Sequence, residues 1–345
     1  MSKVTQQVIA DKIGVSRSTV SLVVSGRRDI AIPEGTRKRI FDAVRRYGYK
    51  YPKAGARKTG NIGYLIHAAM RLEDPYYHRF WSGIQREAAR SGRHVLISQI
   101  DPHAQLPDIV RLGKVDGLII ESNITTEWLK AVSAVVPVVL LDRMAEGNVV
   151  DSVMPDNGIG IKKAFSHLFS LGHRRIAFFG MKPLNLCSIE RVDGYLSALK
   201  EYNRPVEAEY IRMPEMIVGG QEEVDRYTEE TLNLWRNMPI PPTAVVTTGD
   251  IYAVSLIKAA HRLGVVVPGD LSVVGCDNTH SAVVIVPSLT SLDQPMEEMG
   301  RCAMEMLLAR IEESDQRPRR CVRFDMNLVV RESTGPAKST NGGGT

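Results

Sequence analysis

The stretch that decides the fold is VTQQVIADKIGVSRSTVSLVVSG, residues 4–26. Thr5 stands where its hydroxyl can accept a hydrogen bond from an orphan N–H of a first helical turn. Gly14 can adopt the left-handed conformation that ends a helix sharply, and Ser16 can cap a second helix. The stretch therefore predicts two short amphipathic helices joined by a turn.

The second of these helices has two distinct faces. Val20, Val23 and Val24 are spaced to point into a small core. Short hydroxyls and one arginine remain outside, where hydroxyls suit close approach to phosphates and an arginine near a helix N-terminus suits a guanine edge. This layout is typical of a helix-turn-helix that reads the major groove of DNA. An ordinary surface hairpin of two helices is the alternative, because short motifs also match by accident.

Two neighbouring features favour the DNA-binding interpretation. A third helix is expected over residues 33–47, with a proline in its first turn. Residues 1–60 hold 14 Lys and Arg against 4 Asp and Glu, a net charge of +10, whereas the whole chain carries +5. A basic headpiece on an acidic body is the charge pattern of a protein that binds nucleic acid through one end. The candidate DNA-contacting residues are Thr5, Ser16, Arg17, Ser18, Thr19, Ser21, Leu22 and Arg57.

Length and composition bound the remaining possibilities. At 345 residues the chain is long enough for more than one domain. Its polar N-terminus predicts no secretory signal, and its longest apolar run, residues 134–141, is too short to cross a bilayer. The four cysteines are scattered without metal-ligand spacing. We therefore expect reduced thiols in a cytoplasmic protein with no metal, no cofactor and no membrane association.

From residue 61 onward, short β-rich runs alternate with stretches of helical length. Strands separated by helices predict parallel sheets with helices on both faces, and two successive sets of strands predict two α/β lobes. The expected strands are 62–66, 94–98, 117–120, 136–141, 152–154, 175–179, 244–247, 272–275 and 319–328. The expected helices include 76–91, 157–171, 191–202, 250–263 and 294–311.

Polar side chains follow many of these strands. In open parallel sheets, ligands bind beyond the carboxyl ends of the strands, and carboxylates there suit a polyhydroxylated ligand because each can accept from two vicinal hydroxyls. Any one of these residues could instead form a turn or cap a helix, but as a set they predict ligand contact. The set is His67, Asp101, Glu121, Ser122, Asp142, Arg143, Asp250, Asp277 and Asn278.

Catalysis has little support in the sequence. There is no nucleophile elbow, no phosphate-binding glycine loop and no His/Cys/Asp cluster of metal spacing. The chain is therefore expected not to be an enzyme. Its end, residues 335–345, is rich in Gly, Ser and Thr and is predicted to be a disordered tail.

Ordered matches along nearly the whole chain resemble the lactose-repressor (LacI/GalR) family of transcriptional regulators. In the headpiece the matching positions are 4–5, 10, 14–16, 19–21, 23–24, 36–37 and 49–52. In the body they are 62–63, 74–77, 116–120, 142–143, 156–157, 172–176, 191–194, 267–268, 272–275, 289–291 and 331–333.

The resemblance implies a homodimeric repressor of carbohydrate-use genes that binds palindromic double-stranded operator DNA. It implies an all-α headpiece (1–50), a hinge (51–61) and a two-lobed body of the type I periplasmic-binding-protein fold (62–334). The N-lobe would comprise 62–157 and 292–320, and the C-lobe 158–291 and 321–334. A small effector, expected to be a sugar, would bind between the lobes. The alternatives are a purine or other non-sugar effector, or a solute-binding protein of a transporter.

The resemblance also implies roles for particular residues. The family's base-reading positions fall on Arg17, Ser18 and Leu22. Its effector positions match in residue type at Arg191 and Asp277, are similar at Asp250, and include an aromatic pair at 76–77. With Asp101, which follows a predicted strand, the expected effector-binding residues are Tyr76, Tyr77, Asp101, Arg191, Asp250 and Asp277.

The sequence departs from the family pattern after the headpiece. Ala56 and Arg57 are followed by only four residues before the Ile62-Gly63 strand, so the hinge is several residues short. The leucine that wedges into the minor groove is missing. Met216 and Cys276 stand where the family often has aromatic residues.

Overall fold

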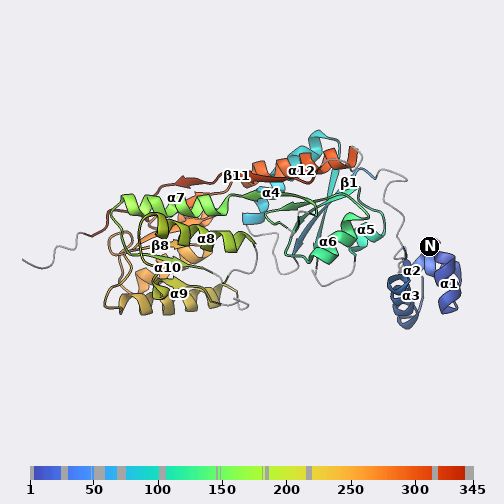
Figure 1. Cartoon of the computed structure of the whole chain (residues 1–345), viewed down its shortest axis with the longest axis horizontal. Helices are drawn as coiled ribbons and strands as arrows, with labels where there is room; N and C mark the ends of the chain where they lie inside the picture. The colour runs from blue at the N-terminus through green and yellow to red at the C-terminus, as the bar shows by residue number, and fades with distance from the viewer. Residues whose placement is uncertain are drawn as a thin grey trace, which may run out of the picture. The chain divides into compact units, whose positions relative to one another are not determined.

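The computed structural model describes residues 4–24, 30–47, 49, 59–67, 75–100, 106–144, 147, 149–180, 182, 186–214, 220–312 and 318–338 (Figure 1). Its contacts divide the chain into two compact units. Unit 1 comprises Met1–Arg71, Ser82–Ser152 and Gly300–Cys321. Unit 2 comprises Leu72–Trp81, Val153–Met299 and Val322–Thr345. The strands form two six-stranded sheets, and each unit holds most of one of them; residues 153–155 and 322–324 of the first sheet are assigned to unit 2.

The headpiece is a bundle of three helices: α1 (Gln6–Ile13), α2 (Arg17–Val24) and α3 (Glu34–Arg46). Both predicted caps and the predicted turn are present. The Thr5 hydroxyl accepts from the N–H of Val8, Gly14 is left-handed with φ 69°, and the N–H of Thr19 donates to Ser16 Oγ at 2.9 Å. The buried core is formed by Ile9, Ala10, Val20, Val23, Val24, Ile40, Ala43 and Val44.

The sheet of unit 1 has the strand order β11-β5-β4-β3-β1-β2. Its strands are β1 (Asn61–His67), β2 (His94–Ile100), β3 (Gly117–Glu121), β4 (Val138–Leu141), β5 (Asp151–Pro155) and β11 (Cys321–Phe324). Because β1 to β4 run parallel, their connections are helices. Two of these, α5 (Asp108–Arg111) and α6 (Thr126–Ser133), bury apolar residues against one face. In Figure 1, α4 (Pro75–Arg90) and α12 (Met296–Glu312) cover the opposite face.

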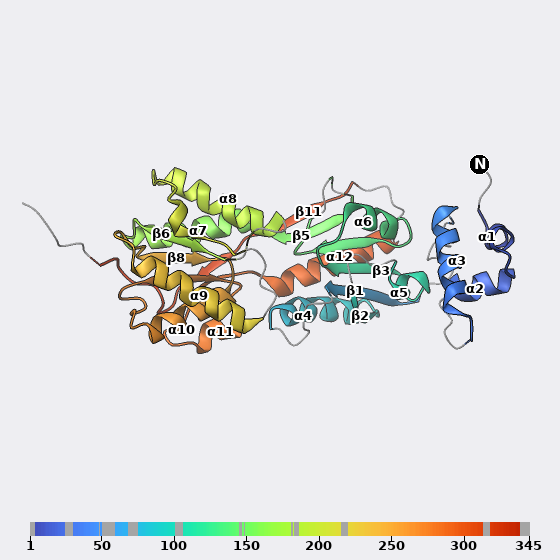
Figure 2. The same ribbon diagram turned by 90° about the horizontal axis from the view of Figure 1, so that it is seen from below.

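The sheet of unit 2 has the strand order β12-β10-β9-β8-β6-β7. Its strands are β6 (Ile176–Phe179), β7 (Ile211–Arg212), β8 (Ala244–Thr247), β9 (Ser272–Cys276), β10 (Thr290–Asp293) and β12 (Asn327–Val329). The helices α7 (Asn157–Ser170) and α8 (Leu186–Glu201) pack on one face. On the other face lie α9 (Gln221–Arg236), α10 (Asp250–Arg262) and α11 (His280–Val284), as Figure 2 shows. The short η2 (Ala208–Tyr210) precedes β7.

Two predicted segments differ from the observed structure. The single strand expected over 319–328 is two strands, since β11 joins the sheet of unit 1 and β12 that of unit 2. The first residues of the expected disordered tail are hydrogen-bonded to unit 2. The N–H of Gly335 donates to Ser272 Oγ at 3.1 Å, and that of Ala337 donates to the Leu171 carbonyl at 2.9 Å. These hydrogen bonds satisfy backbone N–H groups of the tail. A composition rich in glycine and serine does not show that such bonds form.

Candidate DNA-reading helix and effector site

Most of the predicted DNA-contacting side chains lie on α2 or directly before it, while Thr5 caps α1. Ser16, Arg17 and Ser18 are exposed, whereas Thr19, Ser21 and Leu22 are half-buried. Ser16 Oγ lies 2.7 Å from both Ser18 Oγ and Thr19 Oγ1, so three hydroxyls form one cluster at the N-terminus of the helix. Exposed hydroxyls and N–H groups at a helix N-terminus suit a phosphate. Arg57 lies outside the described residues.

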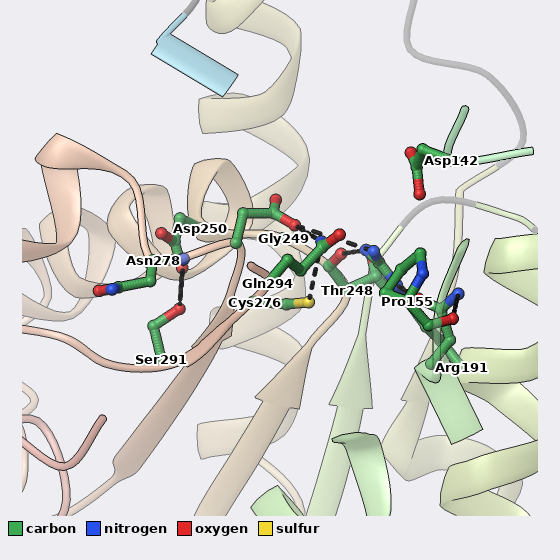
Figure 3. A network of polar contacts seen from close by, with 12 residues as sticks. Asp142, Pro155, Arg191, Thr248, Gly249, Asp250, Cys276, Asn278, Ser291 and Gln294 are labelled. Carbon is green, nitrogen blue, oxygen red and sulfur yellow. Dashed lines mark hydrogen bonds and ion pairs between the residues drawn. The ribbon is translucent and has the colours of Figure 1, made fainter. Parts of the chain in front are cut away.

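Arg191, on α8, is the centre of a polar cluster at the carboxyl edge of the unit 2 sheet. Its Nε donates to Asn157 Oδ1 at 2.7 Å, and its Nη1 donates to the carbonyl oxygen of Thr248. Its Nη2 lies 3.8 Å from Asp277 Oδ1. These partners come from α7, from the loop after β8 and from the turn after β9, so three elements fix one guanidinium (Figure 3).

Close packing of two helices places Arg191. A Cβ on Gly194 would lie 2.6 Å from the carbonyl oxygen of Gly158, a distance that excludes any side chain at position 194. The glycine therefore lets α8 approach the backbone of α7. Because Asn157 also lies at the start of α7, the approach brings Arg191 within hydrogen-bond distance of it.

Asp277 begins a turn of unusual backbone conformation directly after β9. Asp277 and Asn278 have φ values of 107° and 46°, which non-glycine residues rarely adopt. The Asp277 carboxylate accepts from Gln294 Nε2 at 2.6 Å, and its backbone carbonyl accepts from Arg79 Nη1 at 3.1 Å. Arg79 Nη2 also contacts Asp293 Oδ1 at 2.9 Å. The carboxylate thus lies beside Arg191 in a rigid setting.

Two buried groups lie beneath Asp277. The thiol of Cys276 is fully buried, and this burial raises its pKa well above the ordinary value. A thiol with a raised pKa is a small apolar group rather than a nucleophile. Gln294 is also fully buried, and its Oε1 has no hydrogen-bond partner among the described residues. An unsatisfied buried acceptor is costly, so this oxygen is a place where a ligand hydroxyl or N–H could donate.

Asp250, another predicted effector contact, lies at the start of α10 with 1% of its surface exposed. Its Oδ1 accepts from Ser291 Oγ at 2.6 Å, and its Oδ2 accepts from the N–H and the hydroxyl of Thr279 at 2.6 and 3.0 Å. Burial raises the pKa of Asp250 to about 6, although these hydrogen bonds and Arg331 act in the opposite direction. Both carboxylate oxygens are therefore engaged inside unit 2.

The remaining predicted contacts are the aromatic pair and Asp101. Tyr76 and Tyr77 lie half-buried in the first turn of α4, with ring centroids 5.1 Å apart in an edge-to-face arrangement. The Tyr76 ring also meets Phe80 edge to face at 5.4 Å. Asp101 and Met216 lie outside the described residues.

Three side chains of this cluster were missed as candidate ligands: Asn157, Gln294 and Arg79. Asn157 did carry a signal, because it follows a predicted strand and belongs to the family matches. Gln294 stands directly after β10, but that strand was not predicted, so its place at a sheet edge could not be read. Arg79 lies on a helix and offers no positional signal of its own.

Unit 1 has a polar edge of its own at the carboxyl ends of β1, β3 and β4. The Tyr64 hydroxyl donates to Glu121 Oε2 at 2.5 Å, and both residues are fully buried. Asp142 is also buried, has φ 52°, and pairs with Arg143 at 2.6 Å. No group of three or more potential metal ligands occurs within the described ranges. No helix in those ranges is long and apolar enough to span a membrane.

Comparison with known proteins identifies the family. A model of the periplasmic binding protein-like domain matches residues 165–334. Catabolite control protein A from Priestia megaterium is 32% identical over 319 residues, which cover 88% of this chain and 91% of that protein. The chain belongs to the LacI/GalR family. It is a DNA-binding transcriptional regulator, and the helix-turn-helix interpretation of residues 4–26 prevails over the surface-hairpin alternative.

Other LacI-family proteins are similar over comparable lengths. The transcriptional repressor PurR from Mannheimia succiniciproducens is 28% identical over 338 residues, 94% of this chain and 97% of the repressor. A LacI-family regulator from Enterococcus faecium, solved with bound ribose, superimposes with a TM-score of 0.68 at 27% identity. The superposition covers 81% of this chain and all of that one. These relatives confirm the predicted two-sheet α/β body and the function in transcription regulation.

Proposed function

We propose that this regulator is a homodimer that binds a palindromic operator through α2 and is controlled by a sugar bound at the Arg191 cluster. Arg17, Ser18 and Leu22 would read bases, while Thr5, Ser16, Thr19, Ser21 and Arg57 would hold phosphates. The division into a headpiece (1–50), a hinge (51–61) and an effector-binding body (62–334) belongs to this proposal. The control is exerted on transcription, so no chemical conversion of the effector is required.

The observation that carries the effector assignment is the pair of Arg191 and Asp277, with the buried amide of Gln294 beside it, whose oxygen has no hydrogen-bond partner among the described residues. A guanidinium donates to ring and hydroxyl oxygens, while a carboxylate and an amide oxygen accept from vicinal hydroxyls. The set therefore offers both donors and acceptors within a few ångströms, which suits a polyol better than an apolar ligand. The Enterococcus faecium relative with bound ribose supports the same class. We propose that Tyr76 and Tyr77 supply the aromatic contacts.

Exposed apolar side chains of unit 2 support the proposed homodimer, because they could bind a second copy of the chain. Val283, Val284 and Val286 are 56%, 61% and 85% exposed, and Ile251 at the start of α10 is 50% exposed. In Figure 2, α10 and α11 lie side by side, so these apolar groups belong to neighbouring elements. Exposed apolar side chains that form one patch mark interaction surfaces, and we propose that these four side chains do so. We call these four residues the α11 face.

A thermal-shift screen tests the effector proposal. Purified full-length protein is heated with pentoses, hexoses, disaccharides, sugar phosphates and purines, and specific binding at about 100 times Kd should stabilise it by about 2.7 kcal/mol. Arg191→Ala and Asp277→Asn should each abolish the shift caused by the best sugar. Arg226→Ala, a change of the same kind at a side chain that is 70% exposed, should keep it. Stabilisation by a purine and by no sugar would replace the sugar with the alternative effector class.

A further inference from the structure

The turn that carries Asp277 is held in a conformation that its own residues do not favour. Asp277 and Asn278 both have positive φ without being glycine, and such residues persist only where the surroundings over-determine them. We call residues 277–279 the Asp277 turn. Something in the neighbourhood must hold it, because left to itself an aspartate relaxes to negative φ.

The carboxylate of Asp250 forms hydrogen bonds to one end of this turn. Oδ2 accepts both the N–H and the hydroxyl of Thr279, which fixes the residue that ends the turn. Oδ1 accepts from Ser291 Oγ, and that hydroxyl oxygen in turn accepts from the N–H of Asn278 at 3.1 Å. One buried carboxylate therefore reaches two successive residues of the turn, Thr279 directly and Asn278 through a serine. Figure 3 shows Ser291 beside Asp250 and Asn278.

The Asp250 carboxylate is closely packed against the backbone of β9. A Cβ on Gly275 would lie 2.3 Å from Asp250 Oδ1, so glycine is required there for the contact with Ser291 to form. From the far side, Arg331 Nη2 donates to Asn278 Oδ1 at 2.6 Å. Asp250 itself is 1% exposed and both its oxygens already accept hydrogen bonds from the protein, so almost none of its carboxylate is accessible to a bound sugar.

We propose that Asp250 is a positioning residue, not an effector ligand: it holds the Asp277 turn so that the Asp277 carboxylate stays beside Arg191. The proposal deepens the effector assignment above and rests on it for the meaning of Asp277. The positioning role of Asp250 can be tested independently of the effector assignment, because the effect of Asp250 on the turn can be measured without any effector.

Cys276 provides that measurement, since it directly precedes the turn and is fully buried. The other three cysteines are replaced (Cys187→Ala, Cys302→Ser, Cys321→Ser), and the reaction of the remaining thiol with Ellman's reagent is followed under native conditions. Asp250→Asn should raise the labelling rate about tenfold or more, because a local opening replaces the closed turn. The rate should depend only weakly on urea, as expected for an opening that exposes little surface.

Asp225→Asn is the matched control. Asp225 Oδ1 also accepts from a serine hydroxyl, that of Ser255 on α10, at 2.6 Å, but Asp225 lies on α9, and its hydrogen bonds with Ser255 and Gln221 do not reach the turn. Its labelling rate should equal that of the parent. Ser291→Ala, which removes the bridge to Asn278, should behave like Asp250→Asn and serves if that variant does not fold.

The outcomes separate this inference from the sugar proposal. Faster labelling in Asp250→Asn and Ser291→Ala supports the positioning role, whether or not D-ribose, the probe sugar, stabilises the parent. If D-ribose binds the parent, Asp250→Asn should weaken its binding in step with the labelling rate. Unchanged labelling overturns the positioning role, and unchanged labelling with lost D-ribose binding would make Asp250 a direct ligand. The positioning role would also be overturned if the labelling rate depended on urea concentration as strongly as global unfolding does.

Discussion

His173 shows how one buried side chain can set the pH dependence of unit 2. Its Nε2 lies 3.0 Å from the carbonyl oxygen of Gly335 and its Nδ1 lies 2.9 Å from Thr243 Oγ1. A carbonyl can only accept, so Nε2 carries the proton and Nδ1 accepts from the threonine hydroxyl. Both ring nitrogens are thus satisfied in the neutral form. Burial lowers the pKa of His173; the hydrogen bond to the Gly335 carbonyl acts against this shift, while the neighbouring positive charges of His167, Arg174 and Arg175 act with it.

We expect the protein to lose stability as the pH falls below about 6.5, the ordinary histidine pKa. There the unfolded chain binds a proton that folded His173 resists, so the free energy of unfolding falls by up to about 1.4 kcal/mol per pH unit for each such group. His167, whose pKa is also lowered by burial, adds to the effect. His173→Gln should flatten this acid slope in urea unfolding measured over the same pH range. His261→Gln, a change at an exposed helical position, should leave it intact, and an equal slope in all three proteins would refute the assignment.

At the residue scale, the sequence predicted best what depends on near neighbours. Thr5, Gly14 and Ser16 act on backbone groups within five residues, so their roles follow from local chemistry. Asp250 was recognised as important but expected to contact the effector. We propose instead that it positions the Asp277 turn, and its hydrogen-bond partners, Thr279 and Ser291, lie 29 and 41 residues away. Only the fold brings them together, and no local pattern states whether a carboxylate after a strand points outward or into the protein.

At the scale of elements, the contact of α7 with α8 is the one on which Arg191 depends. Gly194→Ala puts a Cβ 2.6 Å from a backbone oxygen that cannot rotate away. We therefore expect a loss of about 1–3 kcal/mol in the free energy of unfolding, as for other overpacked sites, and a weaker effector-induced thermal shift because α8 must move. Chemical denaturation measures the first effect and the thermal-shift assay the second.

Gly158→Ala is the natural control for that change, since it alters the other glycine of the same contact. Its Cβ would meet no atom closer than 3.7 Å, an ordinary van der Waals distance. Alanine is also the better helix former by about 1 kcal/mol in a helix interior, so this variant should be neutral or slightly stabilised. Equal losses in both variants would mean that the close approach at Gly194 does not determine the packing of α7 on α8.

Elements were predictable where hydrophobic runs were long and flanked by turns. The strands β1, β3, β8 and β9 are fully or nearly fully buried parallel strands, which read as continuous apolar stretches. The strand β10, Thr290-Ser-Leu-Asp293, escaped because three of its four residues are polar. Its polarity has a function, since Ser291 contacts Asp250 and Thr290 accepts from the N–H of Arg331. The polar residues that form hydrogen bonds near the site are therefore also the reason that β10 could not be recognised from hydrophobicity.

At the scale of the whole molecule, charge and apolar surface are kept in different segments. The first 60 residues hold the net positive charge of +10, whereas the α11 face lies in unit 2, more than 190 residues further along the chain. Each headpiece has one α2 helix, of eight residues, through which we propose that it reads DNA. A palindromic operator needs two such helices at a fixed spacing, so the affinity for DNA should depend on residues that never touch it.

Val284→Asp places a charge on the α11 face at a side chain that is 61% exposed, so the fold of one chain should tolerate it. If two copies pair there, the buried charge should favour monomers in sedimentation velocity at micromolar concentration. Affinity for a palindromic duplex selected by the parent protein should then fall by about 100-fold or more, because two linked headpieces gain that much in effective concentration. Val206→Asp, at a side chain that is 60% exposed in the segment between α8 and η2, should remain dimeric and bind normally. A dimeric Val284→Asp protein with parental affinity would place the interface elsewhere.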